Sequence, residues 1–500
     1  MKCVLRSACK FYKTVICKVQ NLWSQLRYLM SDSFYSAREI LAQLSSKEMS
    51  ASDLMKCTIA KIWDVNDQLN AIVSFREEEV LLSEAQAADQ VPMDRRGPLH
   101  GLPIAIKDLA DAEGLPTSHG SPIFAGQIAK ADALPVARIR AAGAIIIGKT
   151  NTPEFGLGSH TFNPVFGTTY NPYNLSRSAG GSSGGAAVAL ATGMIPIADG
   201  SDMMGSLRNP AAWNNIYGMR PSWGLVPAEP KEDVFLHSLS TSGPMARNPN
   251  DLALLLSVMS GADSRLPFSM PNERWLPVEP ANLSGKRIGW LNDWGGAFPI
   301  EPSLLKLSSS AVQKFSDMGA SVDVLPAPFS SAALWESWKT LRSWSVAASY
   351  ISLFEAPHFR DLLKPALLWE IERGRGLSGL DIHKASALRS DWYVTAANLF
   401  EQFDVLVLPS TQIWPFPADQ VHPTQINDVE LDTYHRWMEV VIPASLIGLP
   451  VVNVPAGFGH SGLPFGLQLI GGKGQDAALL SIAQAWHEAK DWPKTRPPQF

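Results

Sequence analysis

Three short segments of this 500-residue chain carry side chains that could act together on a carbonyl group. Lys107 lies in GLPIAIKD (101–108), Ser182 in the glycine-rich GGSSGG (180–185) and Ser206 in GSDMMGSLR (200–208). A serine hydroxyl is a weak nucleophile until a base within hydrogen-bond reach takes its proton, and a neutral lysine amine can be that base. The combination indicates nucleophilic catalysis by a serine, with a lysine in place of the more common histidine.

The surroundings of Lys107 fit this role. It ends the apolar run Ile104–Ile106, which is typical of a short buried strand. Burial disfavours the ammonium form and lowers the pKa of a lysine, as a lysine base requires. A lysine at a strand end more often reaches solvent, so Lys107 alone is weak evidence. The two serine segments downstream strengthen the interpretation.

Together the three segments resemble the amidase signature family, whose members cleave amide bonds with a Ser-Ser-Lys triad. The resemblance is close over about residues 60–260 and looser over 400–490. It implies that Ser206 is the nucleophile and that Ser182 passes its proton to Lys107. It also implies an α/β fold, a single large domain with a mixed central β-sheet flanked by helices.

The resemblance assigns further roles around the two serines. It implies a cis peptide bond between Gly181 and Ser182, and an oxyanion hole formed by backbone N–H groups. Those N–H groups belong to Met203, Met204, Gly205 and Ser206. Asp202 and Arg208 are expected to brace the turn through hydrogen bonds or an ion pair rather than to react.

One residue departs from the family pattern. Many members have glycine where this chain has Met204. A side chain there could shift the oxyanion donors, because it restricts positive φ angles. We favour the alternative that Met203 and Met204 line the acyl pocket with two adaptable thioethers.

The rest of the chain predicts a single α/β unit over residues 30–500. Capping patterns at Ser36 and Ser50 predict two or three helices within residues 36–90. The core motifs occupy residues 100–260, a variable middle with no recognisable chemical motif occupies 265–400, and closing strands occupy 400–490. The remaining expected elements are strands at 104–107, 144–147, 404–409, 449–455 and 464–471, and a helix at 186–192.

Composition limits the classes of partner. The net charge of −5 gives no reason to expect nucleic acid, and no apolar run is long enough to span a bilayer. Residues 1–29 hold six basic and no acidic residues. We interpret them as an extension outside the fold, either upstream of a natural start at Met30 or a targeting segment. Only Cys57 lies beyond residue 17, so we expect a reducing, cytoplasmic compartment.

Neither a cofactor nor a metal is predicted, because the ten histidines show no ligand spacing such as H-E-x-x-H. The predicted partner is a small-molecule amide substrate. Oligomeric state stays open, with a homodimer among the arrangements allowed.

Two other motifs suggest different chemistry. Gly143–Thr150 matches the P-loop string, but its Ala-Ile-Ile-Ile interior is strand material rather than a phosphate-binding turn. Gly180–Gly184 matches G-x-S-x-G, the nucleophile elbow of α/β-hydrolases, which would make Ser182 the nucleophile of an esterase. That elbow follows a buried strand, and residues 173–178 do not look like one.

The sequence therefore predicts an amidase that hydrolyses a small carboxamide through a Ser206 acyl-enzyme. The main alternative is the amidase-type subunit of a tRNA-dependent amidotransferase, or a catalytically impaired scaffold. That subunit usually continues with Lys-Pro-Thr-Tyr-Gly-Arg, where this chain has Arg-Pro-Ser-Trp-Gly-Leu at 220–225. The natural substrate is not predicted.

Overall fold

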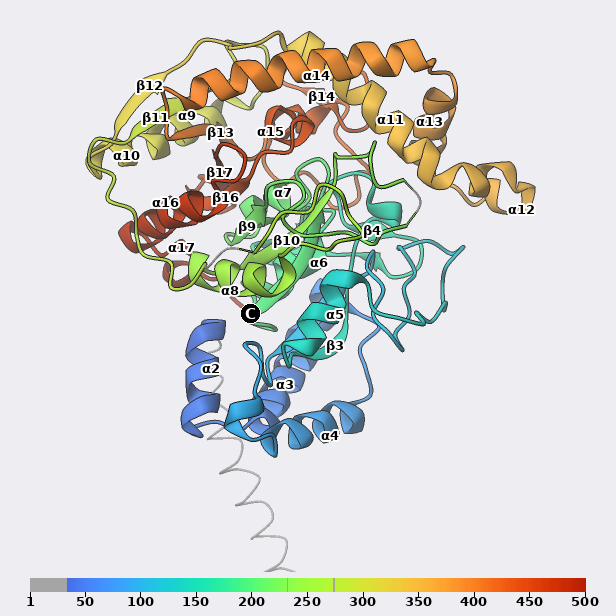
Figure 1. Ribbon diagram of the computed structural model, residues 1–500, viewed down its shortest axis with the longest axis vertical. Helices are drawn as coiled ribbons and strands as arrows, with labels where there is room; N and C mark the ends of the chain where they lie inside the picture. The colour runs from blue at the N-terminus through green and yellow to red at the C-terminus, as the bar shows by residue number, and fades with distance from the viewer. Residues whose placement is uncertain (1–33, 232, 273–274) are drawn as a thin grey trace, which may run out of the picture.

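A computed structural model describes residues 34–231, 233–272 and 275–500 (Figure 1). The basic extension expected at 1–29 lies outside these ranges. Within them, every helix is too short or too polar to cross a bilayer.

The core is a mixed sheet of eight strands. Strand β11 is parallel to both of its neighbours, and the other neighbouring strands are antiparallel. In spatial order the strands are β12 (Ser321–Val324), β11 (Arg287–Trp290), β13 (Val405–Pro409), β17 (Pro464–Ile470), β16 (Val451–Phe458), β9 (Tyr217–Arg220), β10 (Thr241–Ala246) and β8 (Ile197–Asp202). This confirms the predicted mixed α/β fold.

A second sheet holds the strand that ends in Lys107. Its three strands are, in spatial order, β1 (Ile72–Val73), β3 (Ile145–Thr150) and β2 (Pro103–Lys107). Strand β2 is buried along its whole length and pairs in parallel with β3. The Lys107 N–H donates to Asp199 Oδ1 of β8 at 2.9 Å, so the end of β2 is fixed against the edge of the large sheet.

The helices expected within residues 36–90 are present. Ser36 and Glu39 form the predicted capping box at the start of α2. Within the described residues, the first five helices are α2 (Ala37–Ser46), α3 (Ala51–Leu69), α4 (Glu78–Asp89), α5 (Leu134–Ala141) and α6 (Gly184–Ala191). They are followed by α7 (Arg208–Trp213), α8 (Pro249–Met259), α9 (Pro302–Val312), α10 (Lys314–Asp317), α11 (Ser331–Glu355) and α12 (Pro357–Arg360). The last are α13 (Pro365–Arg375), α14 (Gly379–Phe400), α15 (Ile442–Leu446), α16 (Asp476–Ala489) and α17 (Trp492–Thr495).

Short elements complete the described chain. Three two-stranded ribbons are formed by β4 (Phe162–Asn163) with β5 (Gly167–Thr168), β6 (Tyr170–Asn171) with β7 (Asn174–Ser178), and β14 (Gln425–Ile426) with β15 (Val429–Glu430). Short 3₁₀ helices lie at η1 (Met93–Arg95), η2 (Glu154–Gly156) and η3 (Arg436–Val441).

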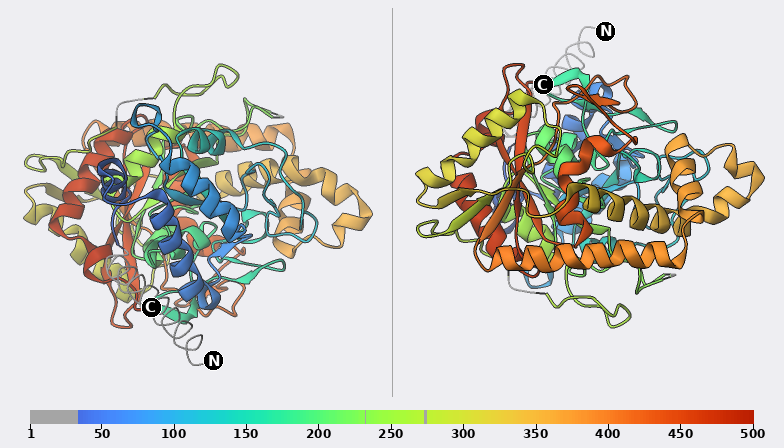
Figure 2. Two further views of the ribbon diagram at one scale, coloured as in Figure 1. Left: turned by 90° about the horizontal axis from the view of Figure 1, so that it is seen from below. Right: turned by 90° about the horizontal axis from the view of Figure 1, so that it is seen from above.

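Helices cover both faces of the large sheet. Helices α9 and α16 lie on one face, and α11, α14 and α15 lie on the other (Figure 2). The short helix α7 packs against β9, β16 and β17. A side chain at Gly218 of β9 would overlap the Leu207 carbonyl, so this glycine lets the start of α7 approach the sheet closely. The turn before α7 is thereby held against the core.

Candidate active site

Strand β2 places Lys107 in the interior, where its side chain is 1% exposed. Its Nζ contacts only neutral oxygens. They are Ser182 Oγ and Ser183 Oγ, both at 2.8 Å, Ser201 Oγ at 3.1 Å and the Ser201 carbonyl at 3.4 Å. Among the described residues, no carboxylate oxygen lies within hydrogen-bond distance of this amine. Ser183 and Ser201 belong to the two serine segments, but the sequence did not distinguish them from their neighbours.

Burial lowers the pKa of Lys107 to about 7, although the negative charges of Asp199 and Asp202 act in the opposite direction. At neutral pH a large fraction of the amine is therefore unprotonated. This is the state in which a lysine can accept a proton from a hydroxyl.

The loop that carries Ser182 is fixed at several points. Gly180 has a φ of +77°, a region that favours glycine, and the peptide bond from Gly181 to Ser182 is cis, as expected from the family. Thr161 Oγ1 donates to the Gly180 carbonyl at 2.7 Å. Helix α6 begins at Gly184, two residues earlier than the sequence suggested. Ser182 is thus presented by a rigid loop rather than a flexible linker.

The turn that carries Ser206 is built around the buried carboxylate of Asp202. This carboxylate accepts hydrogen bonds from the Gly205 N–H at 2.9 Å and the Leu207 N–H at 3.1 Å. It also pairs with Arg208 at 2.9 Å and Arg220 at 3.3 Å. Burial alone would raise the pKa of Asp202, but the two arginines hold the pKa well below its usual range. Asp202 and Arg208 therefore brace the turn.

The four expected oxyanion donors are not equivalent. The Gly205 N–H donates to Asp202 Oδ1 at 2.9 Å in this structure, so it differs from the other three expected donors. Within the described part of the chain, the N–H groups of Met203, Met204 and Ser206 form no hydrogen bond. Met204 is buried and has no positive φ, so a side chain fits at this position without left-handed backbone strain.

The two serines face one cavity. The Ser183 N–H donates to the Ser206 carbonyl at 3.2 Å, which joins the glycine loop to the turn. Ser182 and Ser206 both line a cavity of about 300 Å³. No hydrogen bond joins their two hydroxyl groups in this structure, whereas Ser182 Oγ contacts Lys107 directly. The structure thus brings together all three residues singled out from the sequence.

Comparison with known proteins identifies the family. The family model described as Amidase matches residues 53–480, which is most of the chain. The chain belongs to the amidase signature family. It is therefore an enzyme of the class that hydrolyses amide bonds.

The most similar relatives include two kinds of protein. The chain is 33% identical to an acylamidase of Rhodococcus erythropolis, over 92% of this chain and 97% of the relative. It is 34% identical to one of the subunits of the glutamyl-tRNA(Gln) amidotransferase of Ralstonia nicotianae, over 92% of this chain and 98% of that subunit. Among solved structures, a bacterial aryl acylamidase of the amidase signature family superposes with a TM-score of 0.86 at 29% identity, covering 93% of this chain and 99% of that one.

The cavity of this amidase is completed by the middle of the chain, where the sequence showed no chemical motif. Helix α11 contributes Arg342, Ser345, Ser349 and Tyr350 to its wall. Met203 and Met204 line it as expected, and Arg342 Nη1 donates to Met203 Sδ at 3.1 Å. An arginine on a long helix carries no sequence signal for a site, because its contacts with residues far away in the chain depend on the tertiary fold.

The two competing motifs do not form the structures they suggest. Residues Gly148–Thr150 continue strand β3, and Lys149 is buried with its Nζ donating to Thr117 Oγ1 at 3.1 Å, so no phosphate-binding turn is present there. Residues 174–178 do form a strand, β7, but it is mostly exposed and belongs to a two-stranded ribbon. The glycine loop is therefore not a nucleophile elbow at the end of a central strand.

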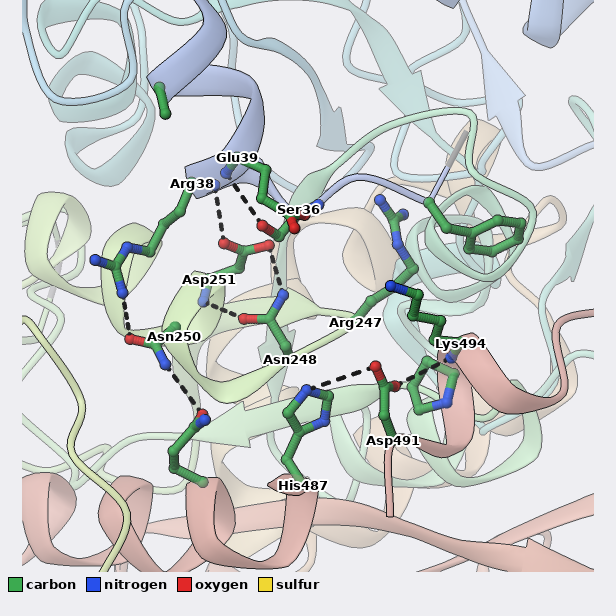
Figure 3. A pocket seen from close by; sticks show the side chains of 14 residues that line it. Ser36, Arg38, Glu39, Arg247, Asn248, Asn250, Asp251, His487, Asp491 and Lys494 are labelled. Carbon is green, nitrogen blue, oxygen red and sulfur yellow. Dashed lines mark hydrogen bonds and ion pairs between the residues drawn. The ribbon is translucent and has the colours of Figure 1, made fainter. Parts of the chain in front are cut away.

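A larger polar cavity, of about 460 Å³, lies where α2, α8, α16 and α17 meet (Figure 3). Several of its charged groups are engaged with the protein itself. Asp251 accepts hydrogen bonds from the backbone N–H groups of Ala37 at 2.8 Å and Arg38 at 3.2 Å, and from Asn248 Nδ2 at 2.8 Å. This cluster anchors the start of helix α2 to helix α8.

Proposed function

We propose that the protein hydrolyses carboxamides through an acyl-enzyme on Ser206, with Ser182 and Lys107 relaying the proton. The observation that carries this proposal is the buried Lys107 amine, 2.8 Å from Ser182 Oγ and surrounded by neutral oxygens. Its pKa of about 7 supports the role of a base at neutral pH. An acylamidase relative aligns with the chain over 97% of its length, in support of the same reaction class.

In the first half-reaction, Ser206 Oγ attacks the carbonyl carbon of the amide. The Ser206 proton passes to Ser182 Oγ while the Ser182 proton passes to the neutral amine of Lys107. Negative charge develops on the former carbonyl oxygen, which the N–H groups of Met203, Met204 and Ser206 would stabilise. The braced turn fixes these donors before the substrate binds.

Collapse of this intermediate breaks the carbon–nitrogen bond. The proton returns from Lys107 through Ser182 to the leaving nitrogen, so that the amine or ammonia departs neutral. A water molecule then attacks the Ser206 ester by the same proton relay, and the carboxylic acid is released. Lys107 and both serines end in their starting protonation states.

A second candidate is the amidase-type component of a tRNA-dependent amidotransferase. It is favoured by the 34% identity to such a component over nearly all of that protein. It is disfavoured by residues 220–225, where the usual Lys-Pro-Thr-Tyr-Gly-Arg string is replaced. In this case the same site would release ammonia from glutamine for a partner enzyme.

Hydrolysis of simple amides by the purified chain separates the two candidates. We expect release of acid and amine without ATP, tRNA or any other protein, and loss of this activity in Ser206→Ala. Activity that appears only with glutamine and partner proteins would instead support the amidotransferase role. Unchanged hydrolysis by Ser206→Ala would contradict both.

A further inference from the structure

A second cavity adjoins the active-site cavity. It measures about 590 Å³ and is formed by loop residues 157–164, residues 364–369 at the start of α13, and residues 421–437. Leu157 and Gly158 line both cavities and form the boundary between them. We refer to this second cavity as the aromatic chamber, because Phe162, Trp369, Tyr434 and Trp437 line it.

The boundary is held in place and is open at one point. Lys364 Nζ donates to the Leu157 carbonyl at 2.9 Å, which ties the loop to α13. Gly158 has no side chain, and a Cβ built at this position would meet no atom within 4 Å. No side chain therefore fills the space beside Gly158, which lines both cavities.

Four aromatic side chains give the chamber apolar wall surface, and Glu154, Lys364 and Asp432 also line it. Aromatic rings favour one another in edge-to-face and offset arrangements, and the ring of Trp369 already lies edge-on to Tyr434 at 6.1 Å. Trp437 is fixed behind the chamber by stacking on Trp213 at 5.7 Å. A cavity of this size and lining is typical of sites that hold most of a small organic ligand.

The position of Ser182 shows which end of the substrate faces the chamber. A Cβ built at Gly156 would lie 3.7 Å from Ser182 Oγ, so the loop leading to Leu157 and Gly158 passes directly beside Ser182. In the proposed reaction Ser182 returns the proton to the leaving nitrogen. The nitrogen and its substituent therefore lie next to Leu157 and Gly158, the boundary between the two cavities. They point away from the oxyanion turn at Met203.

We propose that the aromatic chamber binds the amine part of the substrate, and that the enzyme prefers secondary amides whose nitrogen carries an arylalkyl group. The inference rests on the proposed function, because it takes its orientation from proton return through Ser182. The active-site cavity of about 300 Å³ then holds a small acyl group, and the ring lies beyond Gly158.

The test compares amides that differ only by a ring. The kcat/KM is measured for two pairs of amides. N-ethylacetamide is compared with N-(2-phenylethyl)acetamide, which adds a ring on the amine side. Butyramide is compared with 4-phenylbutyramide, which adds a ring on the acyl side. We expect the amine-side ring to raise kcat/KM by about tenfold or more, as apolar pockets discriminate on this scale. The acyl-side ring is expected to raise it less. Equal values for the first pair, or a larger gain from the acyl-side ring, would overturn the proposal.

Two variants test whether this preference arises in the aromatic chamber. Ala366→Trp fills the chamber, and Trp369→Ala removes one of its walls. Both are expected to lower, by about tenfold, the kcat/KM for N-(2-phenylethyl)acetamide relative to that for N-ethylacetamide. Trp414→Ala is the control, because Trp414 is half-buried like Trp369 and lies edge-on to a neighbouring ring, Phe465, but lines neither cavity. A ratio unchanged in both chamber variants, or lowered equally in Trp414→Ala, would overturn the proposal.

A binding measurement separates failure of the chamber from failure of the proposed function. In Ser206→Ala, which should not turn over, calorimetry is expected to show N-(2-phenylethyl)acetamide binding about tenfold more tightly than N-ethylacetamide. Ala366→Trp in the same background should remove this difference. If the wild type hydrolyses no amide but this difference is present, the proposed reaction is wrong and the chamber assignment holds. If the difference is absent, the chamber assignment is wrong.

Discussion

The active-site cavity and the polar cavity of Figure 3 both contain buried charge, and they use it in different ways. Around Lys107 the amine meets only hydroxyl and carbonyl oxygens, and its pKa falls to about 7. In the polar cavity, Asp251 is occupied by two backbone N–H groups and Asn248, and Arg247 donates to backbone carbonyls. The difference is in the partners rather than in the amount of charge.

This difference separates a reactive group from a structural one. A charged group whose hydrogen bonds go to backbone groups and neighbouring side chains holds elements of the fold together, as Asp251 does for α2 and α8. A group that is desolvated without a charged partner can change its protonation state near neutral pH. The polar cavity is thus the structural one, although it is larger than the active-site cavity.

The largest expected effect follows from removing the amine of Lys107. Lys107→Met should lower kcat/KM for amide hydrolysis by about 10²–10⁴-fold, the usual contribution of a general base. The matched control is Lys314→Met, because Lys314 is a half-buried lysine whose pKa is also lowered by burial and it lies outside the cavity. The control should keep wild-type activity. A Lys107→Met enzyme with more than about a tenth of wild-type activity would contradict a role as base.

The next effect concerns the brace of the Ser206 turn. Asp202→Asn leaves Arg208 and Arg220 as buried charges without a carboxylate, so the free energy of unfolding should fall by about 3–5 kcal/mol. Chemical denaturation measures this change. Asp323→Asn removes an exposed carboxylate from its pair with Arg287 and serves as control, with no measurable loss expected. Equal stability of both variants would show that the brace is not essential.

A third prediction concerns the pH dependence of the rate. Protonated Lys107 cannot accept a proton, so kcat/KM should fall by about tenfold per pH unit below its pKa and level off above it. Because the pKa of Lys107 is about 7, the midpoint is expected near neutral pH. A profile that is flat from pH 5 to 9, or higher in acid, would be inconsistent with a lysine base.

The smallest effect is expected in the polar cavity. Asp251→Asn weakens the hydrogen bonds to the N–H groups of Ala37 and Arg38, so the loss should resemble removal of a helix cap, about 1 kcal/mol. Activity on a small amide should stay at the wild-type value. A large loss of activity with unchanged stability would mean that this cavity takes part in function after all.

Much of the site could be predicted because its residues lie in continuous segments. Lys107 follows an apolar strand, Ser182 stands among glycines and Ser206 stands in a recognisable turn, so each local pattern carried its own signal. Three strands of the large sheet, β13, β16 and β17, were found in the same way, whereas its other five strands were not predicted. Strand β3 was expected to stop at Ile147 and continues to Thr150, because its last residues pair with β1 and β2.

The parts that could not be predicted depend on contacts between distant segments. Arg342 and Trp369 come from helices whose sequence is that of ordinary packed helices, and only the fold places them beside residues 157–206. The engagement of the Gly205 N–H by Asp202 is also a matter of turn geometry that the residue types do not specify. The substrate pocket is therefore less predictable than the catalytic residues.

The central claim is that Ser206 is the nucleophile and that Lys107 activates it through Ser182. The most direct test is reaction of the purified protein with a fluorophosphonate, followed by peptide mapping of the adduct. The proposal predicts a single adduct on Ser206, formed much more slowly in Lys107→Met. An adduct on Ser182, or labelling of Ser206 at the same rate in Lys107→Met, would contradict it.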